Sequence, residues 1–402
     1  MHYQRVDKYL LAHTNKQNVF HCIMNDGPIN KSAIAQRVGL TIPSVMKIVD
    51  SLEENGLTRS LGKGASSGGK PPEMLEVVPD AHYAVGVDIG LSHIRIVIGN
   101  MKKNIIAKYE MSSPKDASAE EMADLLAEKI EQIIDDSGID RSRLLGIGVG
   151  APGLIDNNGG KIVFSPHFRW ENVDLRSALE SRVHYPVYID NVTKDIARAE
   201  YDLGAGRGAK YVFNLNLGRG IASALVIQGD VYYGENGLCG EIGHLTVNRE
   251  GPLCMCGNYG CLEAMASGAA IAQQARDFES RGASSKMLEM ADGEIENIDA
   301  KLVFDACKAG DQPARIIIER ALEYIGIAVA GVINLLDVDR VVINGGMTKN
   351  GDLFWEMIKA NITKHLMKYS GTTVDIVPAA LGDEAAAVGA VCHVIQQFLI
   401  TL

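Results

Sequence analysis

The sequence predicts an α/β protein in which an N-terminal winged helix-turn-helix precedes a larger, two-lobed domain. Residues 15–78 show the pattern of three short helices followed by two strand-like stretches around a Gly/Ser/Lys loop. Further along, a strand-rich segment that begins YAVGVDIG at Tyr83 recurs as YVFNLNLG at Tyr211, which indicates a duplicated βββαβ unit. The length of 402 residues is enough for two or three domains of ordinary size.

Turn signals separate the three N-terminal helices. The first helix ends at Asn25-Asp26-Gly27, Asn30 is placed to cap the second helix, and Gly39 is placed to close it. A short turn to Thr41 precedes the third helix, which is the spacing of a helix-turn-helix. The third helix has an i, i+3, i+4, i+7 apolar stripe that consists of Val45, Ile48, Val49 and Leu52.

A loop with the character of a wing follows the third helix. Two β-compatible stretches flank GKGASSGGK, whose glycines permit close approach to a phosphate backbone and whose lysines supply positive charge. We therefore assign residues 1–78 to a winged helix-turn-helix. The residues expected to contact DNA are Thr41, Ser44, Lys47, Lys63 and Lys70. The alternative is a helical bundle followed by a flexible Gly/Ser linker.

The charge distribution favours a nucleic-acid partner for one part of the chain only. The net charge of −11 argues against nucleic acid for the protein as a whole. Residues 1–72, however, contain nine Lys+Arg and five Asp+Glu, an excess of four positive charges, and the remainder carries an excess of 15 negative charges. Such segregation is expected when one small domain meets a polyanion.

The composition predicts a folded, cytoplasmic protein. Hydrophobic residues make up 47% of the chain and charged residues 22%, which is enough apolar surface for folded cores. The strongly apolar run Ile325–Leu336 is shorter than the roughly 18 residues that a membrane span needs, and the first residues show no signal-peptide pattern, so no membrane association is expected. Seven cysteines in such a chain indicate thiols or metal ligands rather than disulfide bonds.

The second part of the chain divides into two lobes. After three strand-like segments, Ser118 is placed to cap a helix that precedes the strand LLGIGVGAPG from Leu144. We assign the first lobe to residues 82–195, joined by a C-terminal helix at 384–402, and the second lobe to 196–383. Two such lobes that face each other form a cleft, the usual place for a small ligand.

An ordered set of six motifs links the chain to a known family. They are DIGLS at Asp88, GAPG at Gly150, SPHFRW at Ser165, GEIGH at Gly240, CMCGNYGCLE at Cys254 and INGGM at Ile343. Together they resemble the ROK family (repressor, open reading frame, kinase) over essentially the whole chain, and the winged helix points to its xylose, glucose and N-acetylglucosamine repressors. The resemblance implies an actin-like (ribonuclease-H-like) sugar-kinase-type fold and cytoplasmic homodimers or homotetramers.

Four residues have the spacing of a zinc site. His244, Cys254, Cys256 and Cys261 form the pattern H-x9-C-x-C-x4-C. Three thiolates and one imidazole complete a tetrahedral shell and leave no position for water, so this chemistry predicts a structural Zn²⁺. The alternative is a group of buried free thiols. Cys239 lies close by in the sequence, and its exclusion from the site rests on the family resemblance.

The resemblance also implies a sugar site beside the metal. It implies that Asn191, Glu241, His244 and Glu263 contact the sugar, and that Gly153 and the SPHFRW segment line the wall. The imidazole of His244 would use one nitrogen for the metal and the other for a hydroxyl. Carboxylates and amides suit this task because a sugar hydroxyl both donates and accepts hydrogen bonds. The expected ligand is a monosaccharide or a sugar phosphate.

The position of the kinase general base is altered. Kinases of the family carry an Asn-Asp pair whose Asp takes the proton of the attacking sugar hydroxyl. The register fixed by the flanking residues places Asn191 on the Asn and Val192 on the Asp, and valine cannot accept a proton. Asp190 and Asp195 lie nearby in the sequence, so a shifted register remains an alternative.

The two phosphate loops also depart from the kinase pattern. Arg219 stands where the kinases usually have Thr, and Ala222 and Ala224 stand where glycines let the backbone approach phosphate. In the first loop, Leu91 replaces a second glycine. With Val192, these changes predict that the kinase chemistry has been lost and that the protein is not an enzyme.

The sequence therefore predicts a sugar-responsive, DNA-binding transcriptional repressor of carbohydrate-metabolism genes. The predicted partners are a double-stranded DNA operator, a sugar or sugar phosphate, and further copies of the same chain. Two alternatives are an ATP-dependent sugar kinase with an appended DNA-binding domain, and a repressor that a protein partner controls.

Overall fold

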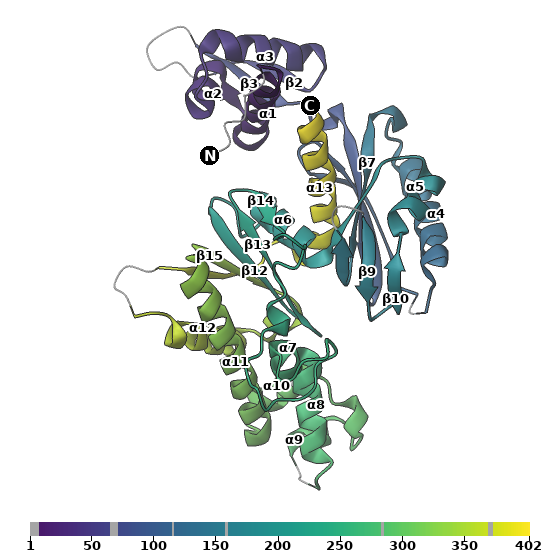
Figure 1. Ribbon diagram of the computed structural model, residues 1–402, viewed down its shortest axis with the longest axis vertical. Helices are drawn as coiled ribbons and strands as arrows, with labels where there is room; N and C mark the ends of the chain where they lie inside the picture. Colours follow the sequence, from purple (N-terminus) through teal and green to yellow (C-terminus); the bar gives the residue numbers. More distant parts are fainter. Residues whose placement is uncertain (1–7, 65–70, 115, 157–159, 283–284, 369–372) are drawn as a thin grey trace. The chain divides into compact units, whose positions relative to one another are not determined.

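The computed structural model describes residues 8–64, 71–114, 116–156, 160–282, 285–368 and 373–402. The chain forms two compact units (Figure 1): unit 1 is Met1–Asp190 with Ala390–Leu402, and unit 2 is Asn191–Gly389. The two unit boundaries fall a few residues from the lobe boundaries expected at 195/196 and 383/384. The division into three domains stays a prediction.

Three helices begin unit 1: α1 (Lys8–Asp26), α2 (Lys31–Val38) and α3 (Ile42–Glu54). Asn30 caps α2 by accepting a hydrogen bond from the backbone of Ala33, and Gly39 ends it in the left-handed conformation at φ 68°. Thr41 caps α3 in the same way. These caps produce the helix-turn-helix that the turn signals predicted.

A three-stranded antiparallel sheet completes this part of unit 1. Its strands are β1 (Ile29–Asn30), β2 (Thr58–Lys63) and β3 (Glu73–Val77), in the order β1-β3-β2. The pair β2 and β3 flanks the loop predicted as a wing. Residues 65–70 of that loop, including Lys70, lie outside the described residues.

The duplicated unit predicted from the sequence is present as two sheets of equal topology. The sheet of unit 1 has the order β6-β5-β4-β7-β11, and that of unit 2 has the order β14-β13-β12-β15-β16. In the first sheet, the central strand β4 pairs antiparallel with β5 and parallel with β7. In the second, the central strand β12 pairs antiparallel with β13 and parallel with β15. The first sheet consists of β4 (Tyr83–Ile89), β5 (His93–Asn100), β6 (Ile105–Ser112), β7 (Leu144–Ala151) and β11 (Val187–Asn191). The second consists of β12 (Tyr211–Leu217), β13 (Ile221–Ile227), β14 (Asp230–Tyr232), β15 (Arg340–Asn344) and β16 (Asp375–Pro378).

Helices and a small sheet surround these strands. Unit 1 adds α4 (Ala119–Ser137), α5 (Leu175–Val183), and the strands β8 (Leu154–Asp156), β9 (Lys161–Ser165) and β10 (Trp170–Val173). Unit 2 contains α6 (Val192–Leu203), α7 (Leu262–Ala266), α8 (Gly268–Glu279), α9 (Lys286–Met290), α10 (Ala300–Lys308), α11 (Gln312–Leu336) and α12 (Asp352–His365). Short 3-10 turns are η1 (Pro79–Ala81), η2 (Arg141–Arg143), η3 (Ile242–His244), η4 (Ile295–Asn297), η5 (Gly346–Asn350) and η6 (Gly382–Glu384).

Each sheet has its own apolar core. In unit 1, α4 packs on the sheet through residues such as Leu126, which lies in one buried cluster with Ile96 and Val149. The predicted cap of α4 is a complete capping box between Ser118 and Glu121. In unit 2, α11 and α12 pack beside β12 and β15 in a second buried cluster.

Helix α13 (Ala385–Thr401) contributes to both units, because the boundary between them falls at Gly389/Ala390. Within unit 1 it lies so close to β7 that a Cβ added to Gly148 would be 2.3 Å from the Ala390 carbonyl oxygen. Among the described residues, only the stretch Gly382–Thr401 is long and apolar enough to cross a membrane, and 61% of it is buried in the protein. Most of its apolar side chains before Gln396 are therefore core residues, whereas Ile400 near its end is 55% exposed.

Candidate metal centre and ligand-binding residues

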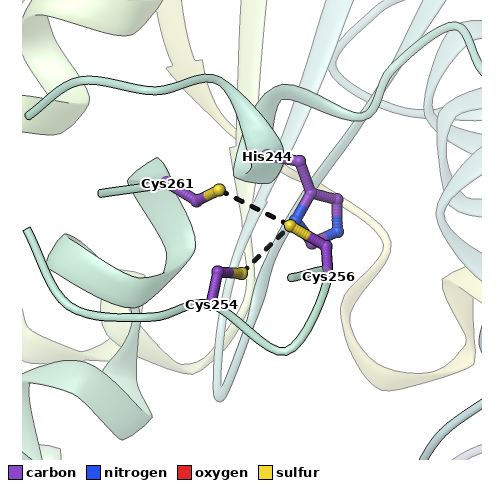
Figure 2. A group of neighbouring side chains, drawn as sticks. All are labelled: His244, Cys254, Cys256 and Cys261. Atoms are coloured by element: carbon purple, nitrogen blue, oxygen red, sulfur yellow. Dashed lines mark hydrogen bonds between the residues drawn. The ribbon is translucent and has the colours of Figure 1, made fainter. Parts of the chain in front are cut away.

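Four side chains of unit 2 converge in a cluster that can hold a metal ion. His244 ends η3, Cys254 and Cys256 lie in the following loop, and Cys261 directly precedes α7. Figure 2 shows the imidazole and the three thiols facing one another, and their ligand atoms all lie within 4.8 Å. The distance from His244 Nδ1 to Cys254 Sγ is 3.6 Å, as is that from Cys256 Sγ to Cys261 Sγ.

These distances suit a cation with tetrahedral coordination. Zinc–sulfur bonds of about 2.3 Å in a tetrahedron separate neighbouring sulfur atoms by about 3.8 Å. The 3.6 Å between the sulfur atoms of Cys256 and Cys261 is close to this value. The predicted cluster of one histidine and three cysteines is confirmed as a group able to hold a metal. Cys239 is not part of it, and all seven cysteines are free thiols.

Backbone contacts shape the loop that brings the four residues together. The backbone N–H of Cys254 donates to the Asn258 carbonyl at 2.7 Å, and that of Gly257 donates to the Cys254 carbonyl at 2.9 Å. Gly260 has φ 65°, and a Cβ added there would lie 1.5 Å from the Asn248 carbonyl oxygen. Only glycine permits this close approach, which places Cys261 beside the tight turn at Cys254.

The three thiols differ in acidity. Burial raises the pKa of Cys254 and raises that of Cys261 to about 12, whereas the backbone N–H of Asn258 lowers the pKa of Cys256. Three adjacent thiolates repel one another, so a divalent cation is the partner that a fully deprotonated set requires.

The imidazole of His244 links the cluster to Glu241. Its Nδ1 faces Cys254, while its Nε2 lies 3.9 Å from a carboxylate oxygen of Glu241. The side chains of His244 and Glu241 are 36% and 44% exposed, so both are accessible to a ligand. This geometry suits the predicted double use of the imidazole, one nitrogen toward a metal and the other toward a ligand.

Glu263 has a structural partner that the sequence did not reveal. It lies in the first turn of α7, directly after the metal cluster, and its Oε2 accepts a hydrogen bond from the backbone of Ile221 at 2.9 Å. A Cβ added to Gly220 would lie 2.5 Å from the same oxygen. Glu263 therefore supports the loop before β13, in addition to its predicted role as a sugar ligand.

The residues predicted to occupy the kinase base position lie at the start of α6. Asn191 caps this helix through a hydrogen bond from the Thr193 backbone at 2.8 Å, and Val192 is its first residue. Asp190 is buried at the end of β11. Asp195 is fully buried and forms an ion pair with Arg198. Both carboxylates of the shifted-register alternative are therefore buried, and that of Asp195 is paired with a guanidinium.

The first of the two predicted phosphate loops contains Asp88 and Leu91. Asp88, at the end of β4, is buried, and burial raises its pKa to about 7, although Arg95 lies 3.6 Å away and opposes this rise. Leu91 is half-buried beside the apolar core of unit 1.

Gly153 belongs to unit 1, beside β9. It has φ 118°, and a Cβ added there would lie 2.3 Å from the Phe164 carbonyl oxygen, so its position requires glycine. The residues of unit 2 predicted to bind sugar are Asn191, Glu241, His244 and Glu263. The participation of all five residues in sugar binding stays a prediction.

The candidate DNA interface lies on α3 and β2. The hydroxyls of Thr41 and Ser44 are 2.9 Å apart at the start of α3, so both also stabilise the helix end. Lys47 and Lys63 are exposed, as their predicted phosphate contacts require. Met46, beside Lys47, is 45% exposed and offers an apolar surface suited to a thymine methyl group, a role that no sequence motif marked.

Comparison with known families decides the relationship. Residues 84–397 match the model of the ROK family, and residues 14–57 match that of the winged helix-turn-helix DNA-binding family. The chain belongs to the ROK family.

Two relatives and two solved structures resemble the chain over most of its length. It is 28% identical to the xylose repressor of Caldicellulosiruptor bescii, covering 97% of both chains. It is 29% identical to the DNA-binding transcriptional dual regulator NagC of Escherichia coli, covering 95% of this chain and 92% of the regulator. A ROK family transcriptional regulator, a homologue of E. coli Mlc, matches with a TM-score of 0.82 and 22% identity. This match covers 97% of this chain and 98% of the regulator. The ROK hexokinase of Thermus thermophilus matches with a TM-score of 0.68 and 30% identity, and the match covers 79% of this chain and 99% of the hexokinase.

Proposed function

We propose that this ROK family protein is a sugar-responsive transcriptional repressor of carbohydrate-metabolism genes. The observation that carries the proposal is a combination within one chain. A winged helix-turn-helix precedes a ROK domain that keeps Glu241 and His244 beside a metal cluster but has Val192 at the general-base position. In this proposal the chain keeps the predicted sugar ligands and lacks the general base that would assist phosphorylation.

The metal in this proposal is a structural Zn²⁺. His244, Cys254, Cys256 and Cys261 would hold it, and their four ligand atoms would fill a tetrahedral shell. When bound, the metal supplies a cross-link between the η3 turn and the start of α7. These two elements carry Glu241 and Glu263, so the cross-link supports the ligand-binding carboxylates.

DNA binding requires two copies of the chain in this proposal. A homodimer or homotetramer presents two α3 helices to successive major-groove half-sites roughly 34 Å apart, and the wings reach the flanking minor grooves. We expect the protein in the cytoplasm, where an operator is accessible. A sugar that binds the DNA-incompetent arrangement more tightly would release the operator.

In this proposal, helix α13 transmits the effect of sugar binding to the DNA-binding part. Its first residues belong to unit 2 and its later residues to unit 1. At its end, the carbonyl oxygens of Leu399 and Ile400 each accept a hydrogen bond from the Gln17 side chain of α1 at 2.9 Å. The end of this helix therefore contacts the DNA-binding part, and its first residues belong to the unit that holds four of the five proposed sugar ligands.

A panel of sugars tests the proposed function. We expect one of D-xylose, D-glucose, N-acetylglucosamine or their phosphates to stabilise the protein, by about 2.7 kcal/mol at a concentration 100 times its Kd. Thermal unfolding measures this stabilisation, and operator release measured with the same sugar connects binding to regulation. Stability that no sugar of the panel changes would contradict the proposal and favour control by a protein partner.

The wing and α3 should contribute phosphate contacts. We expect Lys63→Ala to weaken binding to all DNA sequences about equally and to reduce the slope of log K against log[salt] by about 0.9, because one phosphate contact is lost. Electrophoretic mobility shift at several salt concentrations measures both effects. Lys359→Ala on α12 of unit 2 is the control and should change neither. An unchanged slope for Lys63→Ala would remove this residue from the interface.

A further inference from the structure

Two positively charged side chains are buried on α6. Lys194 is 5% exposed and Arg198 is 4% exposed, and they lie one helical turn apart in unit 2. Burial of an ammonium or a guanidinium group costs free energy unless the charge finds close partners. The partners of these two residues therefore indicate what their charges stabilise.

Both cations contact the segment that follows β14. Lys194 Nζ donates a hydrogen bond to the Gly237 carbonyl at 2.8 Å and lies 4.6 Å from the centre of the Tyr233 ring. Arg198 Nη2 donates to the hydroxyl of Tyr233 at 2.8 Å, and its Nη1 pairs with Asp195 on the same helix. Tyr233 thus receives one cation on its ring and the other on its hydroxyl.

The contacted segment, residues 233–240, leads directly to Glu241. At its far end, Ser223 of β13 donates hydrogen bonds from its backbone and its hydroxyl to the Gly240 carbonyl, at 3.0 and 2.7 Å. Gly240 has φ 102°, and a Cβ added there would lie 2.1 Å from the Ser223 carbonyl oxygen. The segment is therefore held by α6 at its beginning and by β13 at its end, and Glu241 follows the second of these anchors.

Helix α6 also carries a second proposed sugar ligand. Asn191 caps its first turn. The same helix that begins at Asn191 therefore holds, through Lys194 and Arg198, the segment that leads to Glu241. Both connections lie within unit 2, between the residue that carries the Asn191 amide and the residue that carries the Glu241 carboxylate.

We propose that Lys194 and Arg198 are positioning residues for sugar recognition, which fix Glu241 relative to Asn191 and thereby set the affinity for the sugar. This inference rests on the proposed function. A charged hydrogen bond is typically worth about ten- to hundredfold in an equilibrium constant. We therefore expect Lys194→Met to weaken sugar binding by about this factor.

Three variants separate positioning from a general loss of structure. Lys194→Arg keeps a donor for the Gly237 carbonyl and should restore much of the affinity that Lys194→Met loses. Tyr233→Phe removes only the hydroxyl that Arg198 contacts and should give a smaller loss, which keeps the inference testable if Lys194→Met does not fold. Lys359→Met, on α12, is the matched control. Titration calorimetry with D-xylose, D-glucose and N-acetylglucosamine measures affinity, and thermal unfolding reports on the fold.

A double-mutant cycle with Glu241→Gln is decisive. If Lys194 acts through Glu241, Lys194→Met should have little further effect on sugar affinity once Glu241 is Gln. If the losses of sugar binding free energy in the two single variants add in the double variant, the inference is wrong. It is also wrong if Lys194→Met binds the sugar as tightly as the wild type. A wild-type protein that binds none of these sugars would instead overturn the proposed function, and the inference with it.

Discussion

Loss of the metal cluster should abolish sugar binding, with a fall in affinity of more than about 100-fold. Cys256→Ser removes one of the four ligands. The released cross-link would free His244, whose Nε2 lies beside Glu241, and Cys261, which precedes the helix that carries Glu263. A misplacement of about 1 Å is enough to cost roughly 100-fold when several groups must act together. Elemental analysis for zinc and calorimetric sugar titration measure the two losses in the same sample.

The matched control for this variant is Cys307→Ser. Cys307 is a buried thiol on α10 that is not part of the cluster, so this change should leave the zinc content and sugar affinity unaltered. Undiminished sugar affinity in Cys256→Ser protein without bound metal would show that the cluster does not support the ligand-binding carboxylates. One zinc ion per chain is expected in wild-type protein prepared without chelators.

The wild-type protein should not phosphorylate sugars, and Val192→Asp alone should give little activity. A general base is typically worth about 10²–10⁴-fold in rate, but Arg219, Ala222 and Leu91 would still disturb the phosphate loops in this variant. An ATP-coupled assay with D-xylose, D-glucose and N-acetylglucosamine measures turnover. Val192→Asn has nearly the same shape as the aspartate variant and no basic carboxylate, so it isolates the effect of the base.

Turnover by the wild-type protein in the usual range of about 1–10³ s⁻¹ would contradict this prediction and favour the alternative of an active kinase. Asp190 would then be the first candidate for the base, because the carboxylate of Asp195 is paired with Arg198. Robust activity of Val192→Asp alone would show that the altered phosphate loops still position ATP.

The features that the sequence predicted best depend on local contacts or on repetition. Asn30 and Ser118 cap helices by hydrogen bonds to residues three positions away, so their role is readable from the adjacent sequence. The two sheets were predictable because the alternation of apolar residues beginning at Tyr83 recurs at Tyr211, and each copy folds with the same strand order.

The features that the sequence could not show depend on contacts between distant residues. Glu263 supports Ile221, which is 42 positions away, and Lys194 holds Gly237, which is 43 positions away. In a sequence, lysine and arginine predict solvent exposure, and no local pattern marks those that the fold buries. The metal cluster is an exception, because Cys254, Cys256 and Cys261 meet within one short loop.

Val192 bears on whether the proposed repressor responds to the free sugar concentration or to the rate of sugar turnover. An enzyme converts its substrate, so the fraction of enzyme carrying substrate depends on rates of turnover as well as on supply. If Val192 prevents turnover as expected, the protein returns the sugar unchanged, and its occupancy follows the free sugar concentration relative to the Kd at equilibrium. Such a sensor would use no ATP, and its occupancy would not change with the energy state of the cell or deplete the sugar pool.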